Sequence, residues 1–331
     1  RVACICFSFY ADLIDYNLSY LKYLPTGSTV VIVTTKPELI DAWKATLNTK
    51  PELNARYQFQ FRTQPNRGRN ESAYWVTCRD IVESFDYICC LHDKKSPAAT
   101  LPIIGYEWYR HCCEQLLGSR QSVEEILALF ESKPWLGLIE PIEPLFANLQ
   151  NIILAQPWSQ NFELGKRFYE SLQLTVPFDD KPRAPWGGMF WIRGKAMSAL
   201  YRKDWSYADF PAEPLSPDGT LLHVLERMYP SIVQESGYLT AQVVLAERIG
   251  HYYGNLYELA QALAQGGASV SLDSLGDKTR HFPYLRRQIG RYLVGKLTGK
   301  EKVKTREIKR LLRNYWQYKV HKIRNKRREN R

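Results

Sequence analysis

The sequence predicts an α/β protein with a doubly wound, mostly parallel sheet flanked by helices, followed by a basic helical tail. Three observations carry this prediction. Strand-like and helix-like runs alternate through the first 140 residues, β-branched residues concentrate in the strand-like runs, and basic residues concentrate after residue 280. Ligands of such sheets bind where the parallel strands end, so the residues that follow each strand are the first candidates for a site.

Each element has its own signal in the pattern of apolar residues. Apolar and β-branched runs predict strands at residues 2–10, 28–35, 57–64, 87–91, 135–141 and 187–194. Apolar residues at helical spacing predict helices at residues 11–25, 36–48, 69–85, 107–115, 122–131, 195–202, 218–230 and 255–264. We expect the 218–230 helix to end at Pro230, residues 142–180 to be loop-rich, and residues 266–278 to form a linker.

The cysteines favour a reducing compartment. They include adjacent pairs and no zinc-type spacing, and several lie in apolar strand-like runs, where Cys acts as a small hydrophobe. The seven are Cys4, Cys6, Cys78, Cys89, Cys90, Cys112 and Cys113. Because no signal peptide and no run of 18 apolar residues occurs, we expect a cytoplasmic protein without a membrane span. The chain begins without Met, which is what a piece of a longer protein would show.

Positive charge is concentrated in the tail. Residues 281–331 hold 18 Lys and Arg against three Glu, so the rest of the chain carries a formal charge of −4 although the whole chain carries +11. Apolar and aromatic residues recur in this tail at helical intervals, which predicts a basic amphipathic helix on an anionic membrane surface. The alternatives to a membrane-binding tail are a solvated helix and a nucleic-acid-binding helix. Of these partners, nucleic acid is not expected.

The first candidate site is the turn "NRGR", between a predicted strand and a predicted helix. Gly68 permits a tight turn, and Asn66 can bond a base or a ribose. Arg67 and Arg69 place positive charge at a helix N-terminus, which itself favours anions, so an anionic ligand is the expected partner. The alternative is a polar turn whose Asn caps the helix.

The second candidate is "HDKK", directly after the 87–91 strand. Asp93 can bind a divalent cation, and His92 can bind a metal, a phosphate or a sugar. Lys94 and Lys95 are compact cations that suit a diphosphate. The alternative is a solvated loop after a buried strand.

Two further stretches offer a pocket and a base. In "WGGMFWIR", the glycines Gly187 and Gly188 with Trp186, Trp191 and Arg193 suggest a platform for a sugar or acceptor ring, although an aromatic core strand explains Trp191 equally well.

Downstream, Asp218 and then Glu213 are candidates for a general base near a helix start, and His223 on the same helix is a candidate for the sugar or acceptor pocket. A capping role explains Asp218 equally well.

Together these motifs resemble the rhamnan synthesis F family of bacterial polysaccharide assembly. The resemblance covers about residues 1 to 240 and rests on "NRGR", "HDKKSP", "LGLIEP", "GGMFWIR" and "FPAEP…DGTLLHVLER". It implies an inverting glycosyltransferase that moves L-rhamnose from dTDP-L-rhamnose to a lipid-linked, rhamnose-containing glycan at the cytoplasmic membrane face. The implied domains are 1–275, with a nucleotide-sugar half to about 140 and an acceptor half after it, and the tail 281–331.

The motif order is also similar to that of inverting transferases with the GT-A fold. In that comparison "NRG" matches the turn before a helix, "HDK" stands in the place of the Asp-x-Asp metal site, and Asp218 falls where the base would be. With one carboxylate, Asp93, a Mg2+ or Mn2+ ion would be held weakly, and the lysines and arginines could neutralise the diphosphate without a metal.

The alternative function is a non-catalytic scaffold that binds a nucleotide sugar or glycan. A phosphotransfer enzyme is less favoured because no GxxxxGK loop occurs.

Overall fold

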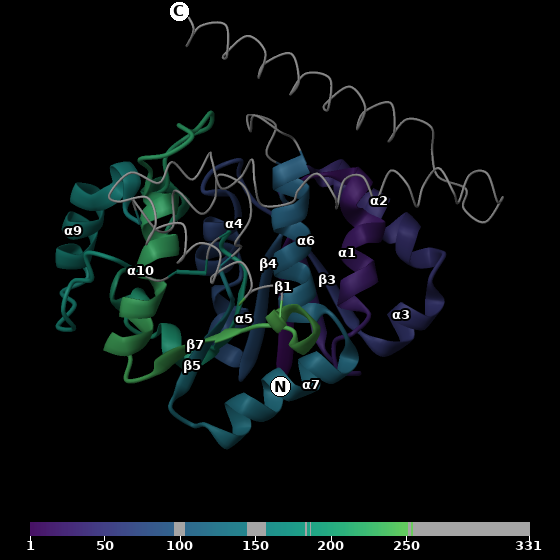
Figure 1. Cartoon of the computed structure of the whole chain (residues 1–331). Coiled ribbons are helices and arrows are strands. Elements are labelled where there is room, and N and C mark those ends of the chain that lie inside the picture. Colours follow the sequence, from purple (N-terminus) through teal and green to yellow (C-terminus); the bar gives the residue numbers. More distant parts are fainter. Residues whose placement is uncertain (96–102, 144–156, 183, 186, 251–252, 254–331) are drawn as a thin grey trace, which may run out of the picture. The chain divides into compact units, whose positions relative to one another are not determined.

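A computed structural model describes residues 1–95, 103–143, 157–182, 184–185, 187–250 and 253 (Figure 1). The chain divides into two compact units. The first comprises Arg1–Lys94, Trp108–Pro144 and Leu149–His251, and the second comprises Lys95–Glu107, Leu145–Asn148 and Tyr252–Arg331. The predicted helix at 255–264, the linker and the basic tail lie outside the described residues.

The first unit is built on a seven-stranded sheet in the order β3-β2-β1-β4-β6-β5-β7. β6 runs antiparallel to β4 and to β5, and the other neighbouring strands run parallel. The predicted mostly parallel sheet is therefore confirmed. The strands are β1 (Val2–Phe7), β2 (Thr29–Thr34), β3 (Gln58–Thr63), β4 (Tyr87–His92), β5 (Leu136–Pro141), β6 (Phe190–Arg193) and β7 (Leu239–Val243).

Helices follow most strands. The α-helices are α1 (Ile14–Leu21), α2 (Pro37–Asn48), α3 (Pro51–Arg56), α4 (Arg69–Ser72), α5 (Arg79–Ser84), α6 (Ile103–Leu117), α7 (Arg120–Ser132), α9 (Phe162–Ser171) and α10 (Leu221–Glu235). A π-turn, η2 (Ala73–Thr77), joins α4 to α5. The 3-10 turns are η1 (Ala11–Leu13), η3 (Ser159–Asn161), η4 (Gly194–Met197), η5 (Leu200–Arg202) and η6 (Tyr207–Asp209).

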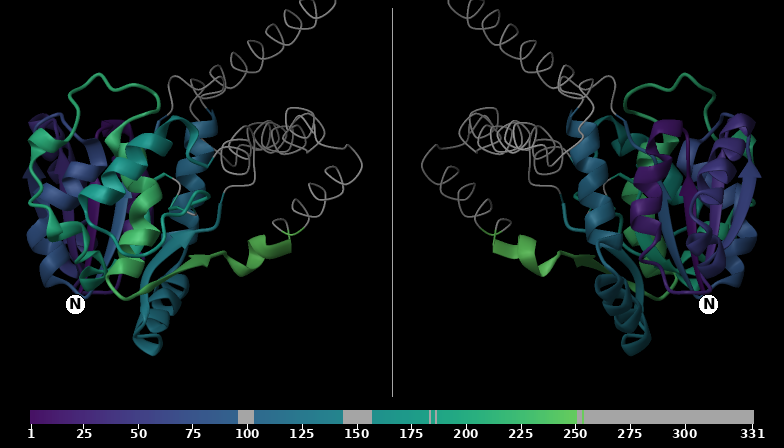
Figure 2. Two further views of the ribbon diagram at one scale, coloured as in Figure 1. Left: turned by 90° about the vertical axis from the view of Figure 1, so that its left-hand side faces the viewer. Right: turned by 90° about the vertical axis from the view of Figure 1, so that its right-hand side faces the viewer.

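The inner strands of the sheet carry apolar side chains on both faces and are buried on both, whereas the edge strands β3 and β7 are partly exposed. In β1, Ile5 points into one core with residues of η2, α5, α9 and α10, whereas Cys4 points into the other core with residues of α1, α2, α6 and α7. Figure 2 shows these helical layers on the two sides of the sheet, so the predicted doubly wound arrangement is confirmed. The seven cysteines are all buried and unbridged, as predicted for small apolar side chains.

Five elements differ from the prediction. The helix expected at 69–85 is interrupted by the π-turn, and the one expected at 195–202 is a pair of 3-10 turns. Helix α9 occupies part of the segment expected to be loop-rich, and β7 has no predicted counterpart. Helix α10 continues past Pro230 to Glu235, because the residues after the proline, such as Ile232, are buried in the core and offset the lost backbone hydrogen bond.

Candidate functional site

The parallel strands β1, β2 and β4 end side by side. Phe7 of β1 pairs with Val33 of β2 and with His92 of β4, so the segments that follow these strands meet at one edge of the sheet. β3 pairs in parallel with β2, which brings the "NRGR" turn to the same edge. Two of the predicted motifs are therefore together at the edge where such sheets bind ligands.

Asp93 is the best-bonded group at this edge, with only 6% of its surface exposed. Its Oδ2 accepts hydrogen bonds from the backbone N–H of Phe9 (2.8 Å) and Tyr10 (2.9 Å) and from the Ser8 hydroxyl (3.2 Å). Its Oδ1 accepts from the Asn17 side-chain amide at 2.7 Å. Burial raises the pKa of Asp93 by more than these hydrogen bonds lower it.

These four donors bear directly on the predicted metal site. Three of the four donors bond to Oδ2, so that oxygen is saturated, whereas Oδ1 accepts from Asn17 alone and keeps one lone-pair position. Within the described ranges, no group of three or more His, Cys, Asp or Glu side chains is placed to hold a metal ion. The described residues therefore do not fit an Asp-x-Asp type of Mg2+ or Mn2+ site, and the metal role of Asp93 stays a prediction.

His92 is fixed between two backbone carbonyl groups. Its Nδ1 lies 3.0 Å from the Asp93 carbonyl oxygen, and its Nε2 contacts the Gly187 carbonyl oxygen. Burial and the nearby charge of Lys94 lower the pKa of His92 to about 4, although both carbonyl groups favour the protonated ring. The ring is therefore neutral at physiological pH and has one N–H to donate.

Lys94 brings a partly buried cation to the same place. Its Nζ lies 4.4 Å from the centre of the Trp108 ring, in a cation–π contact. Burial lowers the pKa of Lys94, the neighbouring carboxylate of Glu226 raises it, and the charge of Arg69 lowers it. These influences show that the strand end, the "NRGR" turn and helix α10 act on one another electrostatically.

The "NRGR" turn is joined to the segment that precedes α10. Gly68 has a φ of 81°, and a Cβ there would lie 2.7 Å from Cγ of Phe210, so glycine is required for this close contact. Arg67 donates its Nε–H to the Phe210 carbonyl oxygen. Arg69 forms two hydrogen bonds to the Glu213 carboxylate, at 2.7 and 3.2 Å. Asn66 is exposed at the tip of the turn.

Both predicted bases already have partners. The hydrogen bond from Arg69 lowers the pKa of Glu213, which also accepts from the backbone N–H of Leu215 at 3.0 Å.

Asp218 accepts from the Asn161 side chain at 2.6 Å and lies 3.8 Å from Nδ1 of His223. Burial raises the pKa of Asp218, but hydrogen bonds from residues 159–161 and Gly219 outweigh it and lower the pKa to about 2. Their roles as bases stay predictions.

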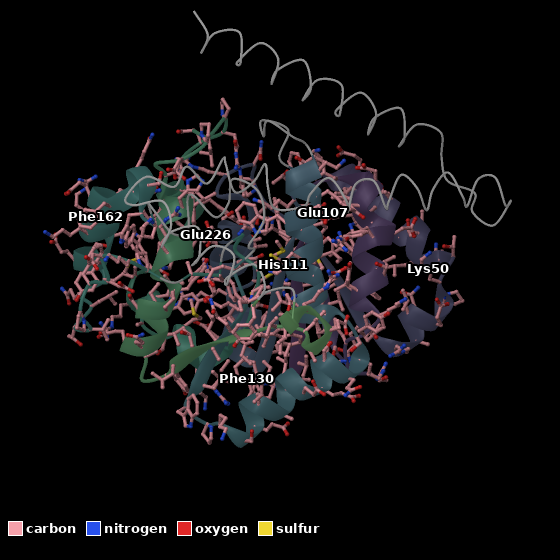
Figure 3. The ribbon with its side chains drawn as sticks, in the orientation of Figure 1. Lys50, Glu107, His111, Phe130, Phe162 and Glu226 are labelled. Carbon is pink, nitrogen blue, oxygen red and sulfur yellow. The ribbon has the colours of Figure 1, made fainter. Side chains whose placement is uncertain are left out.

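The glycine turn packs against the protein's own side chains. Gly187 and Gly188 have φ values of 97° and 65°, and a Cβ on Gly188 would lie 2.9 Å from Nδ2 of Asn70. The Gly187 N–H donates to Oε1 of Glu226, which α10 presents toward the sheet (Figure 3). The two glycines thus pack closely against α4 and α10, and their role in a sugar or acceptor pocket stays a prediction.

Two predicted pocket residues lie elsewhere. Trp191 is fully buried, and its Nε1–H donates to the Leu116 carbonyl oxygen, so the core-strand alternative holds for it. Because β6 is antiparallel, Arg193 pairs with Tyr87 at the start of β4, opposite the ligand edge, where it donates to the Leu136 and Phe130 carbonyl oxygens. The placement of these two residues in a sugar pocket is wrong.

Two more predicted residues cannot be assigned to this edge. Trp186 lies outside the described residues. Lys95 is exposed and belongs to the second unit.

Sequence patterns did not identify Glu71. It lies in α4 with 2% of its surface exposed, directly beneath the glycine turn. As an acid in the first turn of a helix it looked like an ordinary helix-favouring residue. The spacing from Glu71 to Trp75, four residues along a buried helical stretch, was the signal that could have found it.

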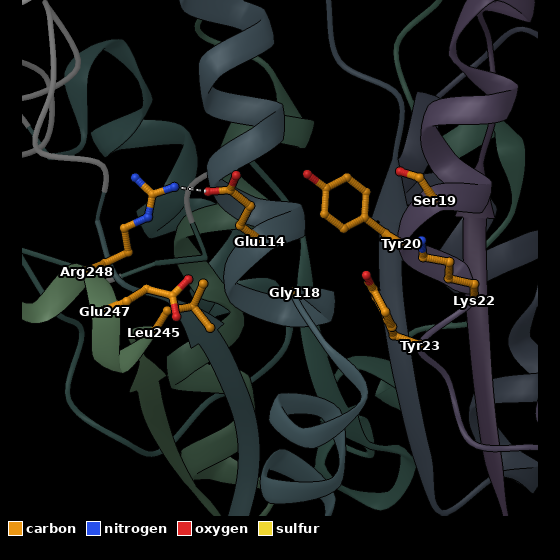
Figure 4. A pocket seen from close by; sticks show the side chains of 9 residues that line it. All are labelled: Ser19, Tyr20, Lys22, Tyr23, Glu114, Gly118, Leu245, Glu247 and Arg248. Carbon is orange, nitrogen blue, oxygen red and sulfur yellow. Dashed lines mark hydrogen bonds and ion pairs between the residues drawn. The ribbon is translucent and has the colours of Figure 1, made fainter. Parts of the chain in front are cut away.

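Two cavities lie apart from these predicted residues. One of about 340 Å³ is bordered by α1, α6 and the residues after β7, where Arg248 pairs with Glu114 at 2.7 Å (Figure 4). Another, of about 400 Å³, is lined by residues that include Phe168, Trp205 and Lys203. Neither cavity is lined by His92, Asp93, Lys94 or Arg69.

Comparison with known proteins gives one family match. The model of the rhamnan synthesis protein F family matches residues 1–238. The uncharacterized protein WxcX of two Xanthomonas campestris pv. campestris strains is 26% identical over 243 residues, which are 73% of this chain and 32% of WxcX. This chain thus spans about a third of the length of the curated relatives it matches.

One solved structure was also compared. A mannosyltransferase from Pyrobaculum calidifontis, in complex with GDP-Man and Mn2+, aligns with a TM-score of 0.39 and 13% identity. The alignment covers 81% of this chain and 66% of that one.

Replacing Asp93 with Asn tests the importance of its hydrogen bonds. In Asp93→Asn an amide NH2 faces a buried N–H donor, so we expect the free energy of unfolding to fall by about 2–3 kcal/mol in urea denaturation. The exposed Asp41→Asn on α2 is the matched control and should change it by less than about 0.5 kcal/mol. Equal losses in the two variants would contradict this assignment.

Proposed function

Because the chain belongs to the rhamnan synthesis protein F family, we propose that it is a glycosyltransferase of polysaccharide synthesis that uses a nucleotide-activated sugar. One observation carries this proposal: two cations, Arg69 and Lys94, lie at the carboxyl edge of parallel strands. Arg69 is paired there with Glu213, and Glu226 acts on Lys94. A departing nucleoside diphosphate gains negative charge in the transition state, and cations held at that position stabilise it.

The proposed donor is dTDP-L-rhamnose, and the proposed acceptor is a lipid-linked, rhamnose-containing glycan. Arg69 holds the Glu213 carboxylate through two hydrogen bonds, which is the geometry in which a guanidinium also holds a diphosphate. On binding, the diphosphate takes the place of Glu213 at Arg69. Lys94 then supplies a further donor to the same group.

The proposed base is Asp218, with Glu213 as the second candidate. An inverting transfer needs a carboxylate on the side of the sugar opposite the leaving diphosphate, within hydrogen-bond reach of the acceptor hydroxyl. Asp218 is partly exposed and, with a pKa of about 2, is ionised throughout the physiological range. Glu213 becomes more basic once Arg69 turns to the diphosphate, because Arg69 is the main cause of its lowered pKa.

Donor binding is the first test. In titration calorimetry we expect dTDP and dTDP-L-rhamnose to bind in EDTA about as well as in Mn2+, because Arg69 and Lys94 carry the charge. Arg69→Ala should weaken dTDP binding about tenfold or more, whereas the exposed Arg120→Ala on α7 should not change it. Failure of the wild-type chain to bind dTDP in either condition would contradict the proposed function.

Transfer is the second test. Asp218→Asn should lower rhamnosyl transfer to the glycan by about 10²–10⁴-fold while dTDP still binds, because the amide cannot accept the hydroxyl proton. The exposed Asp204→Asn is the matched control. Since Asp218 also holds Asn161, a melting curve must show that the variant is folded. Transfer by Asp218→Asn at the control rate would remove it from the mechanism.

A scaffold that binds a nucleotide sugar without turnover is the second candidate function. It is favoured by one observation: both acids near the helix start have lowered pKa values and hydrogen-bonded carboxylates, which makes them weak bases. Donor binding without transfer or hydrolysis under any acceptor condition would support the scaffold.

We also propose that the protein acts at the cytoplasmic face of the membrane through its basic tail. No helix in the part of the chain that the structure describes is long and apolar enough to cross a membrane. The tail holds 18 basic and three acidic residues and lies outside the described residues. Basic amphipathic segments bind anionic lipid by charge and by apolar burial.

Truncation after residue 280 tests the tail. In vesicle sedimentation we expect the full chain to bind phosphatidylglycerol vesicles and to be released by added salt, whereas the truncated chain should stay in the supernatant. Neutral phosphatidylcholine vesicles are the control. Unchanged sedimentation of the truncated chain would refute the role of the tail.

A further inference from the structure

Glu71 joins two helices through one buried carboxyl group. Its Oε1 accepts a hydrogen bond from the Asn70 side-chain amide at 2.9 Å, and its Oε2 accepts from the Trp75 indole at 3.0 Å. The same Oε2 bonds to the hydroxyl of Tyr229 on α10. Tyr229 also accepts from the Trp75 indole at 2.9 Å. The cluster therefore links α4, which begins with Arg69, to the middle of α10.

The glycine turn rests on this cluster. A Cβ on Gly188 would lie 2.9 Å from Asn70 Nδ2, 3.4 Å from Glu71 Oε1 and 3.9 Å from His92 Nε2. The Tyr74 hydroxyl donates to the Gly188 carbonyl oxygen at 3.2 Å. The neighbouring Gly187 N–H donates to Glu226, one turn before Tyr229 on α10. Three elements that carry the proposed donor site thus meet at Glu71.

The surroundings of Glu71 disfavour a negative charge. The titratable groups that act on it or respond to it are acidic: Tyr229 and Glu226 on α10, Tyr74 on the π-turn, and Cys90 on β4. Burial raises the pKa of Glu71 to about 8, because it outweighs the hydrogen bonds from Tyr229, Trp75 and Asn70. The carboxyl group is therefore mainly neutral at pH 7.

We propose that neutral Glu71 is a positioning residue that holds α4, the glycine turn and α10 in the arrangement that binds the donor diphosphate. This inference rests on the proposed function. Loss of the proton would place a negative charge, held by three hydrogen-bond donors alone, in a buried site that Glu226 makes still less favourable for it. The start of α4 would then move away from α10, and Arg69 and His92 would lose their common geometry.

The consequence is a defined dependence of donor affinity on pH. If dTDP binds only the neutral form, the apparent Kd equals the intrinsic Kd divided by the neutral fraction. With a pKa of about 8 for Glu71, dTDP should bind about tenfold more weakly at pH 9 than at pH 7. With a second pKa of about 6, the terminal phosphate is about nine-tenths ionised at pH 7 and almost completely ionised at pH 9, so its own titration contributes little and in the opposite direction.

The experiment is calorimetry of dTDP with the full chain at pH 7, 8 and 9. Glu71→Gln removes the titrating group: its amide oxygen can accept from Trp75 and Tyr229, and its NH2 can donate to the Asn70 side-chain oxygen once that amide is turned over. We expect its Kd to be independent of pH, and the exposed Glu83→Gln on α5 to follow the wild type. Lys94 also has a lowered pKa, but it is unchanged in Glu71→Gln, so an alkaline loss due to Lys94 would persist there.

A second variant and a second measurement keep the test decisive if Glu71→Gln does not fold. Tyr229→Phe removes the largest of the hydrogen bonds that lower the pKa of Glu71, so its alkaline loss of dTDP affinity should move to higher pH. The folded pKa of Glu71 lies above its unfolded value, so its contribution to stability is full below about pH 4.5 and is lost as pH rises through about 8. The Glu71→Gln variant should lack this part of the decline in melting temperature.

The outcomes separate the two proposals. A wild-type chain that does not bind dTDP at pH 7 overturns the proposed function and this inference with it. A wild-type chain that binds dTDP equally at pH 7 and pH 9, or a Glu71→Gln variant that loses affinity as the wild type does, overturns the inference alone. If Glu71→Gln does not fold, an unshifted alkaline profile in Tyr229→Phe overturns it.

Discussion

The hydrogen bonds of the Asp93 carboxylate are the constraint on which the strand edge depends. One side chain from the end of β4 collects two backbone N–H groups and a hydroxyl from the chain after β1, and an amide from α1. Satisfying these donors offsets the cost of burying a carboxylate. The direction in which the chain leaves both strands is fixed as a result. His92 and Lys94, on either side of Asp93, are thereby directed to the space above the sheet edge.

The cations of this edge are balanced by the protein's own acids. Arg69 holds Glu213, and the charge of Glu226 acts on Lys94. An arginine paired with a movable carboxylate is less costly to keep than a lone cation, and it can exchange that partner for a ligand anion of similar shape. The carboxylate would be released beside the incoming sugar. Binding and the supply of a base would then be two results of one exchange.

Local sequence patterns predicted most of the fold and placed the "NRGR" and "HDKK" motifs after neighbouring strands, because β-branched runs and strand-end polar residues are local signals. They could not predict the direction of β6, since a short apolar strand has the same composition whichever way it runs, and this misplaced Arg193. They also missed Glu71, whose burial depends on Tyr229, 158 residues away in the chain. Helix α10 continued through Pro230 because buried residues beyond the proline outweigh its local preference.

The place of β6 in the sheet has a consequence for how the chain acquires its structure. β4 and β5 are joined in the finished sheet only through β6, which lies about 50 residues after β5 in the sequence. During synthesis the edge of β4 therefore stays open until residue 193 has left the ribosome. An open strand edge invites pairing with another chain, and such long-range pairing is slow to form. Fragments that end near residue 140 should on this account aggregate, even though they contain all of β1 to β4.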